Sequence, residues 1–351
     1  FKQKTAYEIG VRLVGSEMCI RDRGIISSAK IAREHLIPAI QKSKNSTVYG
    51  LASRNKNTAL KVSKAHKIPN SYDSYKKMYK DKNIQVVYNP LPNHLHLSST
   101  IEACKNKKHV LLEKPITLSS KDVDKLMKVA KENKVIVKEA FMVRYHPQWL
   151  WAKKYIKQGN IGEVKSILTS FSFYSDDPKN IRNSYPQSQG GGSIYDLGCY
   201  PVVISRFLLD KEPKRVVSTS LIHKKFKVDT VSSAILDFGG VFSTFNCSTQ
   251  SALKQQVIIS GTKKTIVIEN PFNPDGQATN ILIYKGSSIF RKDNEVKVIP
   301  KSNHYTNLVE AFSDHLIKKT KMDYGLMDAK KNMKVLDALF KSAKNKKWEK
   351  V

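Results

Sequence analysis

The chain has 351 residues, 40% of them hydrophobic and 26% charged, which is enough for two domains with sizeable cores. No apolar run is long enough to span a bilayer, and the four cysteines lack the paired spacing of a disulfide framework or a zinc site, so we expect a cytoplasmic protein without a membrane partner. The 61 basic and 30 acidic residues give a net charge of +31. Because the lysines are spread along the whole chain, we interpret this charge as the surface of an enzyme with some attraction for anionic ligands, and not as a specific nucleic-acid site.

Residues 1–23 are expected to be a non-native or disordered start. Residues 6–23 resemble translated sequencing-adapter sequence, and residues 21–23 read Arg-Asp-Arg where a doubly wound sheet needs its central strand. Three consecutive charges are unfavourable in a strand that is covered on both faces. The sequence therefore predicts a shortened first strand, with roughly the first 18 residues loosely attached.

Residues 24–40 read as the end of a strand, a turn of small residues and a helix, which is where a dinucleotide-binding fingerprint would lie. Small residues replace the usual glycines, yet they still allow the backbone to approach a pyrophosphate at the start of the helix. An ordinary tight turn is the alternative interpretation. The residues predicted to contact a cofactor in this turn are Ser27, Ser28, Ala29 and Ile31.

The next strand, residues 47–53, ends on Ser53 and Arg54. In dinucleotide-binding folds this position contacts the ribose of the cofactor, and an acidic residue there is typical of NAD. A hydroxyl and a guanidinium suit the 2′-phosphate of NADP instead, so NADP is favoured and NAD is the alternative. The alternative is that Arg54 is a solvated loop residue with no functional role.

A third strand leads into the loop 89–96, which contains two prolines and two asparagines. We predict that Pro90, Asn93 and His96 contact the cofactor, with capping of the following helix as the alternative. His94 and His96 have the spacing of a metal pair, but no third ligand lies nearby in the sequence, so no metal site is predicted.

The apolar run at residues 110–116 contains Glu113, Lys114 and Pro115 and reads as a buried parallel strand. Chemistry in an open α/β sheet lies beyond the carboxyl ends of such strands, so Lys114 is the first candidate catalytic residue. Pro115 restricts Lys114 to an extended conformation, and the bond between them can be cis. An ordinary surface lysine at the end of a strand is the alternative.

The alternation of strands and helices as far as residue 145 predicts a doubly wound parallel sheet. After that point alternating strands follow one another with few helices, which predicts a large open, mostly antiparallel or mixed sheet within residues 146–351. The fold class is therefore α/β throughout. The predicted strands of the second half span residues 163–175, 214–223, 228–238, 241–250, 256–261, 264–268 and 279–285, and the closing helices lie near 304–319 and 327–344.

Three glycines at 190–192 lead into an apolar helix that carries Asp196 and Tyr200. Residues four apart lie on one face of a helix, and two polar tips on a buried helix need a reason. One interpretation is a pair of functional residues. The other is that both tips bond to the backbone and Tyr200 fills the core.

Taken together and in this order, the motifs resemble the Gfo/Idh/MocA family of oxidoreductases, in the branch of glucose–fructose oxidoreductase, dihydrodiol dehydrogenase and NADP-linked xylose dehydrogenases. This branch has Tyr where many relatives have His in an Asp-x-x-x-His motif, and Tyr200 stands at that position. The missing fingerprint glycines are a departure, although serine and alanine occur there in relatives. The segments that carry the resemblance are 24–32, 89–96, 113–115, 139–147 and 190–200.

The resemblance implies a Rossmann domain at residues 24–145 that binds NADP, and an α/β domain at residues 146–351 that binds substrate. The open sheet of the second domain often forms the subunit interface in the family, so a homo-oligomer, a dimer or tetramer, is expected. The substrate would be a cyclic sugar, a polyol or a similar secondary alcohol held between the domains.

The family likeness also implies roles for the candidate residues. Tyr200 would be the acid or base, and Lys114 close to its phenol would lower the pKa from about 10. Asp196 would bind a substrate hydroxyl or hold Lys114 in place. Glu113 would contact the cofactor or orient the backbone, and Lys114 would also contact the cofactor.

Arg144 and His146 are predicted to help bind the substrate, with bracing of the crossing between domains as the alternative. Specificity is expected to come from several loops, with Tyr174, Arg182 and Tyr185 as candidates. Three other functions stay open: an NAD-assisted glycoside hydrolase on the same scaffold, a non-catalytic NADP-binding regulator, and a nucleic-acid binder suggested by charge alone.

Overall fold

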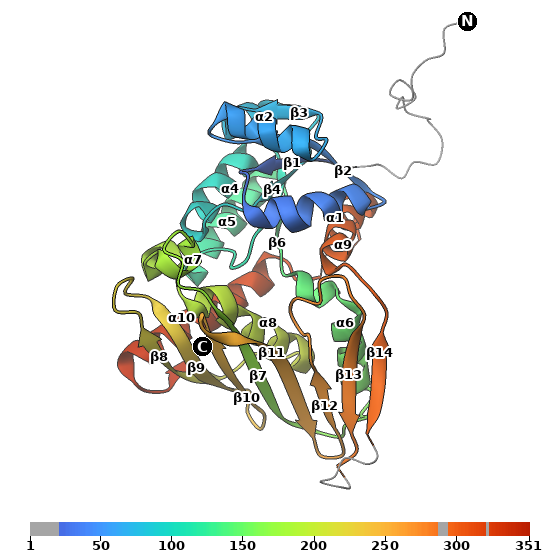
Figure 1. The fold of residues 1–351 in the computed structure, drawn as a ribbon, viewed down its shortest axis with the longest axis vertical. Helices are drawn as coiled ribbons and strands as arrows, with labels where there is room; N and C mark the ends of the chain where they lie inside the picture. The colour runs from blue at the N-terminus through green and yellow to red at the C-terminus, as the bar shows by residue number, and fades with distance from the viewer. Residues whose placement is uncertain (1–20, 287–293, 321–322) are drawn as a thin grey trace, which may run out of the picture.

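The chain folds into two α/β domains stacked along the long axis of the molecule (Figure 1). The computed structural model describes residues 21–286, 294–320 and 323–351. The expected loose attachment of the start of the chain concerns residues 1–20, which lie outside that range. Within the described residues, no helix is long and apolar enough to cross a membrane.

The N-terminal domain, over its described residues, is a six-stranded parallel sheet with the strand order β3-β2-β1-β4-β5-β6. The doubly wound parallel sheet predicted from the sequence is confirmed. The chain order of the strands reverses between β1 and β4, and folds of this kind bind their ligand beyond the carboxyl ends of the strands at that point. The elements are β1 (Arg21–Ile26), one helix formed by η1 (Ala32–Leu36) and α1 (Ile37–Lys42), β2 (Ser46–Ala52), α2 (Lys56–Ala65), β3 (Asn70–Tyr72), α3 (Tyr75–Lys80), β4 (Val86–Asn89), η2 (Asn93–Leu95), α4 (His96–Lys105), β5 (His109–Leu112), α5 (Ser120–Asn133) and β6 (Val137–Glu139).

The first strand contains the charged residues that the sequence interpretation excluded from it. Residues Arg21–Arg23 pair with Ser46–Val48 of β2, with a register shift after Arg23. The Arg23 side chain is fully buried, and its Nη2 donates to the carbonyl of Val309 at 3.2 Å and to the hydroxyl of Ser313. Burial lowers the pKa of Arg23 to about 9. The exclusion of these charges from the strand was wrong, because a helix near the end of the chain supplies two acceptors for Nη2, while Nε and Nη1 have no partner among the described residues.

The C-terminal domain, over its described residues, is a nine-stranded sheet with the order β14-β13-β12-β11-β7-β10-β9-β8-β15. All its pairs are antiparallel except β7 with β10, so the predicted open, mostly antiparallel sheet is confirmed. Its elements are α6 (Pro147–Lys157), β7 (Val164–Tyr174), α7 (Ile181–Ser184), η4 (Gln187–Gln189), η5 (Ile194–Gly198), α8 (Cys199–Leu209), β8 (Arg215–Ile222), β9 (Asp229–Asp237), β10 (Phe242–Ser248), β11 (Gln250–Gly261), β12 (Thr265–Ile268), β13 (Thr279–Tyr284), β14 (Glu295–Ile299), α9 (His304–Lys318), α10 (Leu326–Asn345) and β15 (Glu349–Lys350).

The two closing helices hold the domains together. Helix α9 packs on α1 and β2 and on the crossover turn η3 (Met142–Tyr145), which all belong to the first half of the chain. Helix α10 packs on α5 and β6 as well as on β8 and α8 of the second domain. Each of these helices therefore connects the two domains. The exact domain boundary between residues 145 and 146 stays a prediction.

Candidate active site

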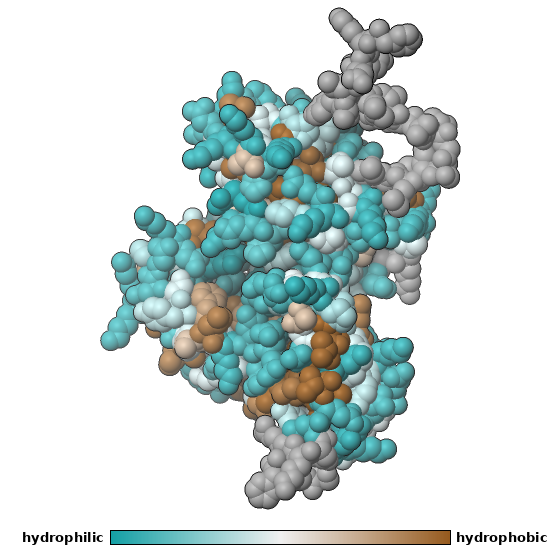
Figure 2. Space-filling view, turned by 45° about the vertical axis from the view of Figure 1, so that its right-hand side comes forward, coloured by the Kyte–Doolittle hydropathy of each residue, from teal (hydrophilic) through white to brown (hydrophobic). Residues whose placement is uncertain are grey.

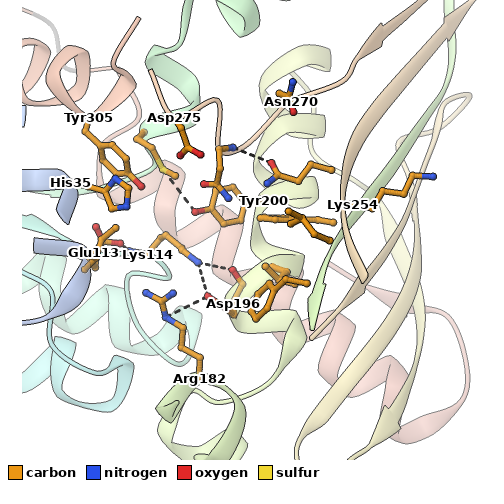
Figure 3. Close-up of a pocket in the computed structure, with 18 residues that line it drawn as sticks. His35, Glu113, Lys114, Arg182, Asp196, Tyr200, Lys254, Asn270, Asp275 and Tyr305 are labelled. Atoms are coloured by element: carbon orange, nitrogen blue, oxygen red, sulfur yellow. Dashed lines mark hydrogen bonds and ion pairs between the residues drawn. The ribbon is translucent and has the colours of Figure 1, made fainter. Parts of the chain in front are cut away.

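A cavity of about 700 Å³ lies between the domains, beyond the carboxyl end of the parallel sheet (Figure 3). Its walls come from the start of the first helix, the end of β5, the turn from η5 into α8, strands β7 and β11, and the start of α9. Glu113, Lys114, Asp196 and Tyr200 all line it. Residues far apart in the sequence thus meet in one site.

Lys114 follows β5 closely and makes an ion pair with Asp196 of the other domain. Its Nζ donates to the carbonyl oxygen of Asp196 at 2.5 Å and to Oδ1 at 3.1 Å (Figure 3). The two side chains are only 9% and 7% exposed. Burial works against both charges, yet the attraction between them leaves the pKa of Lys114 raised and that of Asp196 lowered. The pair is therefore charged in the ligand-free protein. The Lys114–Pro115 bond is cis, one of the two forms that the sequence allows.

Asp196 lies in the π-helical turn η5, which runs directly into α8 and Tyr200. The turn is anchored by Asp229 of β9, whose Oδ2 accepts from the backbone N–H of Ile194 at 2.7 Å and from the hydroxyl of Ser193 at 2.8 Å. Gly192 just before the turn has a φ of 107°, and a Cβ there would lie 2.1 Å from Oδ1 of Asp229. The glycine run is thus required for the approach that fixes the start of this helix.

Tyr200 is packed among aromatic rings of Phe141, Phe171 and Phe272, and its hydroxyl faces the sulfur of Met142 at 3.9 Å. The Lys114 ammonium lies over the face of the phenol ring, 4.6 Å from its centroid, and not beside the hydroxyl. Burial raises the pKa of Tyr200 well above its ordinary value. The expected lowering of this pKa by Lys114 is therefore wrong for the ligand-free protein, since desolvation dominates.

Glu113 sits beneath the cavity with both carboxylate oxygens engaged. Oε1 accepts from the Tyr88 hydroxyl at 2.6 Å, and Oε2 accepts from the backbone N–H of Lys114 at 3.1 Å. Burial raises the pKa of Glu113. Its contact with Lys114 is one of the two roles considered for it, the orientation of the backbone.

The small-residue turn has the geometry of a glycine turn although it holds a serine. Ser27 adopts a φ of 75°, in the left-handed region, and its N–H donates to the carbonyl of Ala52 at 2.8 Å. Ser28 and Ala29 follow at the start of the helix, and Ile31 lines the cavity. Free N–H groups at a helix start are a general site for phosphate.

The end of β2 carries Ser53, which is buried, and Arg54, which is exposed. Burial raises the pKa of Tyr75, partly offset by the charge of Arg54 and by hydrogen bonds from Arg54 and Ser27. A guanidinium, two hydroxyls and a phenol therefore gather beside the small-residue turn. This donor set fits a phosphorylated ribose better than a bare diol.

Comparison with known proteins decides the family. Residues 22–141 match the oxidoreductase family with an NAD-binding Rossmann fold, and residues 149–267 match the GFO/IDH/MocA C-terminal domain. The chain belongs to the GFO/IDH/MocA oxidoreductases. The resemblance inferred from the motifs, the α/β fold class and the assignment as an oxidoreductase are thereby confirmed.

Several relatives cover nearly the whole chain. An uncharacterized oxidoreductase, ORF334 of Rhizobium meliloti, is 37% identical over 93% of this chain and 98% of its own. D-xylose 1-dehydrogenase (NADP(+)) 2 of Haloferax volcanii is 29% identical over 91% of this chain and 96% of its own. KijD10, a 3-ketoreductase from Actinomadura kijaniata solved with NADP and TDP-benzene, has the same fold, with a TM-score of 0.85 at 23% identity over 92% of this chain and 98% of its own.

In this GFO/IDH/MocA member the loop 89–96 makes structural contacts through the three residues that were predicted to contact the cofactor. The His96 ring is fully buried, with its nitrogens 3.0 Å from the carbonyl of Pro115 and 2.8 Å from that of Leu91. Asn93 donates to the carbonyl of Gly190 in the other domain at 2.9 Å, and Pro90 is buried. None of the three lines the described cavity. Their contacts place them as supports of the site, and direct contact with a cofactor stays a prediction.

Arg144 does not line the described cavity, and its contacts support the alternative interpretation, while contact with substrate stays a prediction. Its guanidinium pairs with Asp328 of α10 and stacks 4.2 Å from the ring centroid of Tyr324. Arg206 of α8 binds the other oxygen of Asp328 at 2.7 Å. The network joins the crossover turn to the helix of Tyr200, which is the bracing role that the sequence left as the alternative.

His146 likewise does not line the described cavity, and its predicted contact with substrate stays a prediction. The ring is buried, caps the start of α6 by accepting from the N–H of Gln148 at 3.2 Å, and packs edge-to-face on His304 with centroids 5.8 Å apart. The described residues contain no group of three potential metal ligands, at the His94 and His96 pair or elsewhere.

Acid should destabilise the protein through its buried histidines. Burial lowers the pKa of His96 to about 4, of His146 to about 4 and of His304 to about 3. Below a pH of about 6.5 the unfolded chain binds these protons and the folded protein does not, so stability present above that pH is lost as the pH falls toward 4, by about 1.4 kcal/mol per pH unit for each histidine. Thermal unfolding between pH 7.5 and 4.5 measures this slope.

The matched variant is His304→Gln, which should unfold with a shallower dependence on pH in the same range. A melting temperature that is flat between pH 7 and 5, or an unchanged slope in this variant, would contradict the assignment of the acid sensitivity to these rings.

The site also contains residues that sequence reasoning did not assign. His35 and Tyr305 line the cavity with ring centroids 5.0 Å apart, and Lys254 and Asp275 lie at its outer side (Figure 3). Arg182 was only a candidate for specificity, yet it lies against Asp196. No sequence pattern indicated Tyr305, because it reaches the site from α9, a helix late in the chain that packs on the first domain.

Proposed function

We propose that this protein is an NADP-dependent oxidoreductase that transfers a hydride between the nicotinamide and a cyclic sugar, a polyol or a similar secondary alcohol. The observation that carries the proposal is the meeting of Lys114, Asp196 and Tyr200 in a cleft beyond the carboxyl end of the Rossmann sheet. The relatives support it, since they include a D-xylose dehydrogenase and dihydrodiol dehydrogenases.

The nicotinamide, when bound, supplies the donor or acceptor of the hydride. Tyr200 exchanges the proton of the substrate hydroxyl. With its pKa raised by burial, the phenol is protonated in the ligand-free protein and ready to donate, as reduction of a carbonyl requires. A substrate oxygen between the phenol and Lys114 would bring the ammonium into electrostatic contact with both, which stabilises the phenolate that oxidation of an alcohol requires. Asp196 fixes the ammonium for that task.

Arg54 is expected to select NADP over NAD. Replacing Arg54 with Ala should raise the Kd for NADPH by about 10- to 100-fold, the effect of removing a charged hydrogen bond, while leaving NADH binding near its original value. Fluorescence titration of both nucleotides measures it. The control is Lys56→Ala, since Lys56 is an exposed cation at the start of α2. Equal loss for NADPH and NADH, or no loss, would contradict the assignment.

The direct test of the function is a cofactor-reduction screen with pyranoses and polyols, run with NADP and NAD in parallel. We expect growth of the reduced-nicotinamide absorbance with a subset of cyclic sugars and with NADP. Release of nitrophenol from nitrophenyl glycosides without net change of the nicotinamide would instead support the glycoside hydrolase.

We also propose that the open face of the C-terminal sheet binds a second copy of the chain. Figure 2 shows hydrophobic surface gathered over this domain. Paired residues of eight adjacent strands put almost only aliphatic side chains in one row on the outer face, where a solvated sheet would be polar. The row is Val217, Ile235, Thr244, Leu168, Ile258, Val267, Leu282 and Val296. Leu168 and Val296 remain 50% and 56% exposed, so a self-complementary partner would cover them.

Charges in this row should separate the copies. Leu168 and Ile258 pair at its centre, and the double variant Leu168→Glu, Ile258→Glu is expected to be a monomer when the original chain is an oligomer. Light scattering after size exclusion measures the mass. Leu60→Glu is the control, because Leu60 is 48% exposed on α2 of the other domain. A monomeric original chain at micromolar concentration would contradict the proposal.

A further inference from the structure

Arg182 presents an unused guanidinium edge to the cavity. Its Nε lies 3.6 Å from Oδ1 of Asp196, the same oxygen that accepts from Lys114 (Figure 3). Across residues 21–286, 294–320 and 323–351, neither Nη atom donates a hydrogen bond. The side chain is 50% exposed although it lines the site. The two Nη groups of Arg182 are thus available to donate hydrogen bonds to a ligand in the cavity.

The backbone under Arg182 is held firmly, so the position of this edge is defined. Its N–H donates to Oδ1 of Asn180 at 3.2 Å, and its carbonyl accepts from the N–H of Gly192 at 2.8 Å. The next residue, Asn183, is buried and donates to the carbonyl of Ser175 at 3.1 Å. The segment therefore connects Arg182 directly to the glycine turn that starts the Asp196 helix.

The surrounding charges favour a neutral partner over an anion. Asp196 lies 3.6 Å from the guanidinium and is shared with the Lys114 ammonium, and both Asp196 and Glu113 raise the pKa of Arg182. The two carboxylates thus balance the two cations, so an anionic group of a ligand would add an unbalanced charge there, whereas hydroxyl oxygens would not. Two neighbouring hydroxyl oxygens match the spacing of two Nη donors.

We propose that Arg182 is a specificity-determining residue, whose Nη groups donate to two neighbouring hydroxyls of the substrate beside the carbon that reacts at Lys114 and Tyr200. This assignment rests on the proposed function. It predicts that the enzyme distinguishes a sugar from its deoxy analogue at these positions. Lysine at this position keeps the charge but loses the fork.

The test compares kcat/KM for the best cyclic sugar of the screen with that for its deoxy analogues, each lacking one hydroxyl next to the reacting carbon. The original enzyme should prefer the parent sugar by about 10- to 100-fold. Arg182→Lys and Arg182→Gln should lose most of this preference, chiefly through a higher KM for the parent sugar, with an unchanged Kd for NADPH. Lys179→Ala, an exposed cation on the same segment, should behave like the original enzyme.

The possible outcomes distinguish failure of the Arg182 role from failure of the proposed function. Turnover with the same preference in the original enzyme and in both Arg182 variants would overturn the role of Arg182 alone. Preference for a sugar acid over the neutral sugar would overturn the choice of hydroxyls. NADPH binding without turnover of any sugar or polyol by the original enzyme would overturn the proposed function, and the role of Arg182 with it.

Discussion

Replacing Tyr200 with Phe is expected to lower kcat for sugar oxidation and for carbonyl reduction by about 10²- to 10⁴-fold, the usual contribution of a positioned acid or base. Among the residues that the structure describes, the hydroxyl has a hydrogen-bonding contact only with the Met142 sulfur at 3.9 Å, so its removal should cost little stability. Lys114→Ala should lose a similar factor, because Asp196 would then lie buried without its nearest cation. Steady-state kinetics with saturating NADP measures both.

A second tyrosine, in the turn η5 just before α8, provides the control. Tyr195 donates its hydroxyl to the carbonyl of Leu118 at 2.7 Å and does not line the cavity, so Tyr195→Phe should leave kcat near the original value. Titration with NADPH should give the original Kd for all three variants. Near-normal kcat in Tyr200→Phe would remove Tyr200 from the reaction.

Replacing Asp328 with Ala is expected to lower the free energy of unfolding by about 3–5 kcal/mol, because it breaks a buried ion-pair network. The side chains of Arg144 and Arg206 are only 4% and 3% exposed, and both bind this carboxylate. Arg206 keeps Glu212 as a partner, at 2.6 Å, but within the described part of the chain Arg144 has no second carboxylate partner. Urea unfolding measures the change.

The matched control is Asp210→Ala, which removes a carboxylate that also pairs with two cations, Lys153 and Lys157. Because Asp210 is 47% exposed, the loss should stay below about 1 kcal/mol. Similar losses in both variants would mean that the Asp328 network does not brace the crossover turn against α8.

Much of the fold followed from periodicity. The seven strands predicted in the second half all occur, and most of their ends agree to within one or two residues, because each alternates between a buried and an exposed face. Strand β14 was missed, since Glu295-Val-Lys-Val-Ile is short and contains a glutamate and a lysine. Helix α6 was missed as well, because its start at Pro147 was read as part of the crossing between domains.

The sequence predicted some residues of the candidate site, but not their contacts. Lys114, Asp196 and Tyr200 stand in motifs that a sequence reveals, but their mutual geometry depends on the π-helical turn and on Asp229 beneath it. Arg23 is a residue whose position the sequence predicted wrongly. A charge that looks misplaced in a central strand is accommodated by acceptors some 286 positions away, which no local pattern indicates.

The most direct test of the central claim follows a deuterium label. A sugar that the protein oxidises, carrying deuterium on the reacting carbon, should pass that label to the nicotinamide of NADP directly and without loss to water, and Tyr200→Phe should slow the transfer without changing its course. Mass spectrometry of the reduced cofactor reads the result. Cofactor without the label, or product formed by cleavage of a glycosidic bond with no labelled cofactor, would contradict the account.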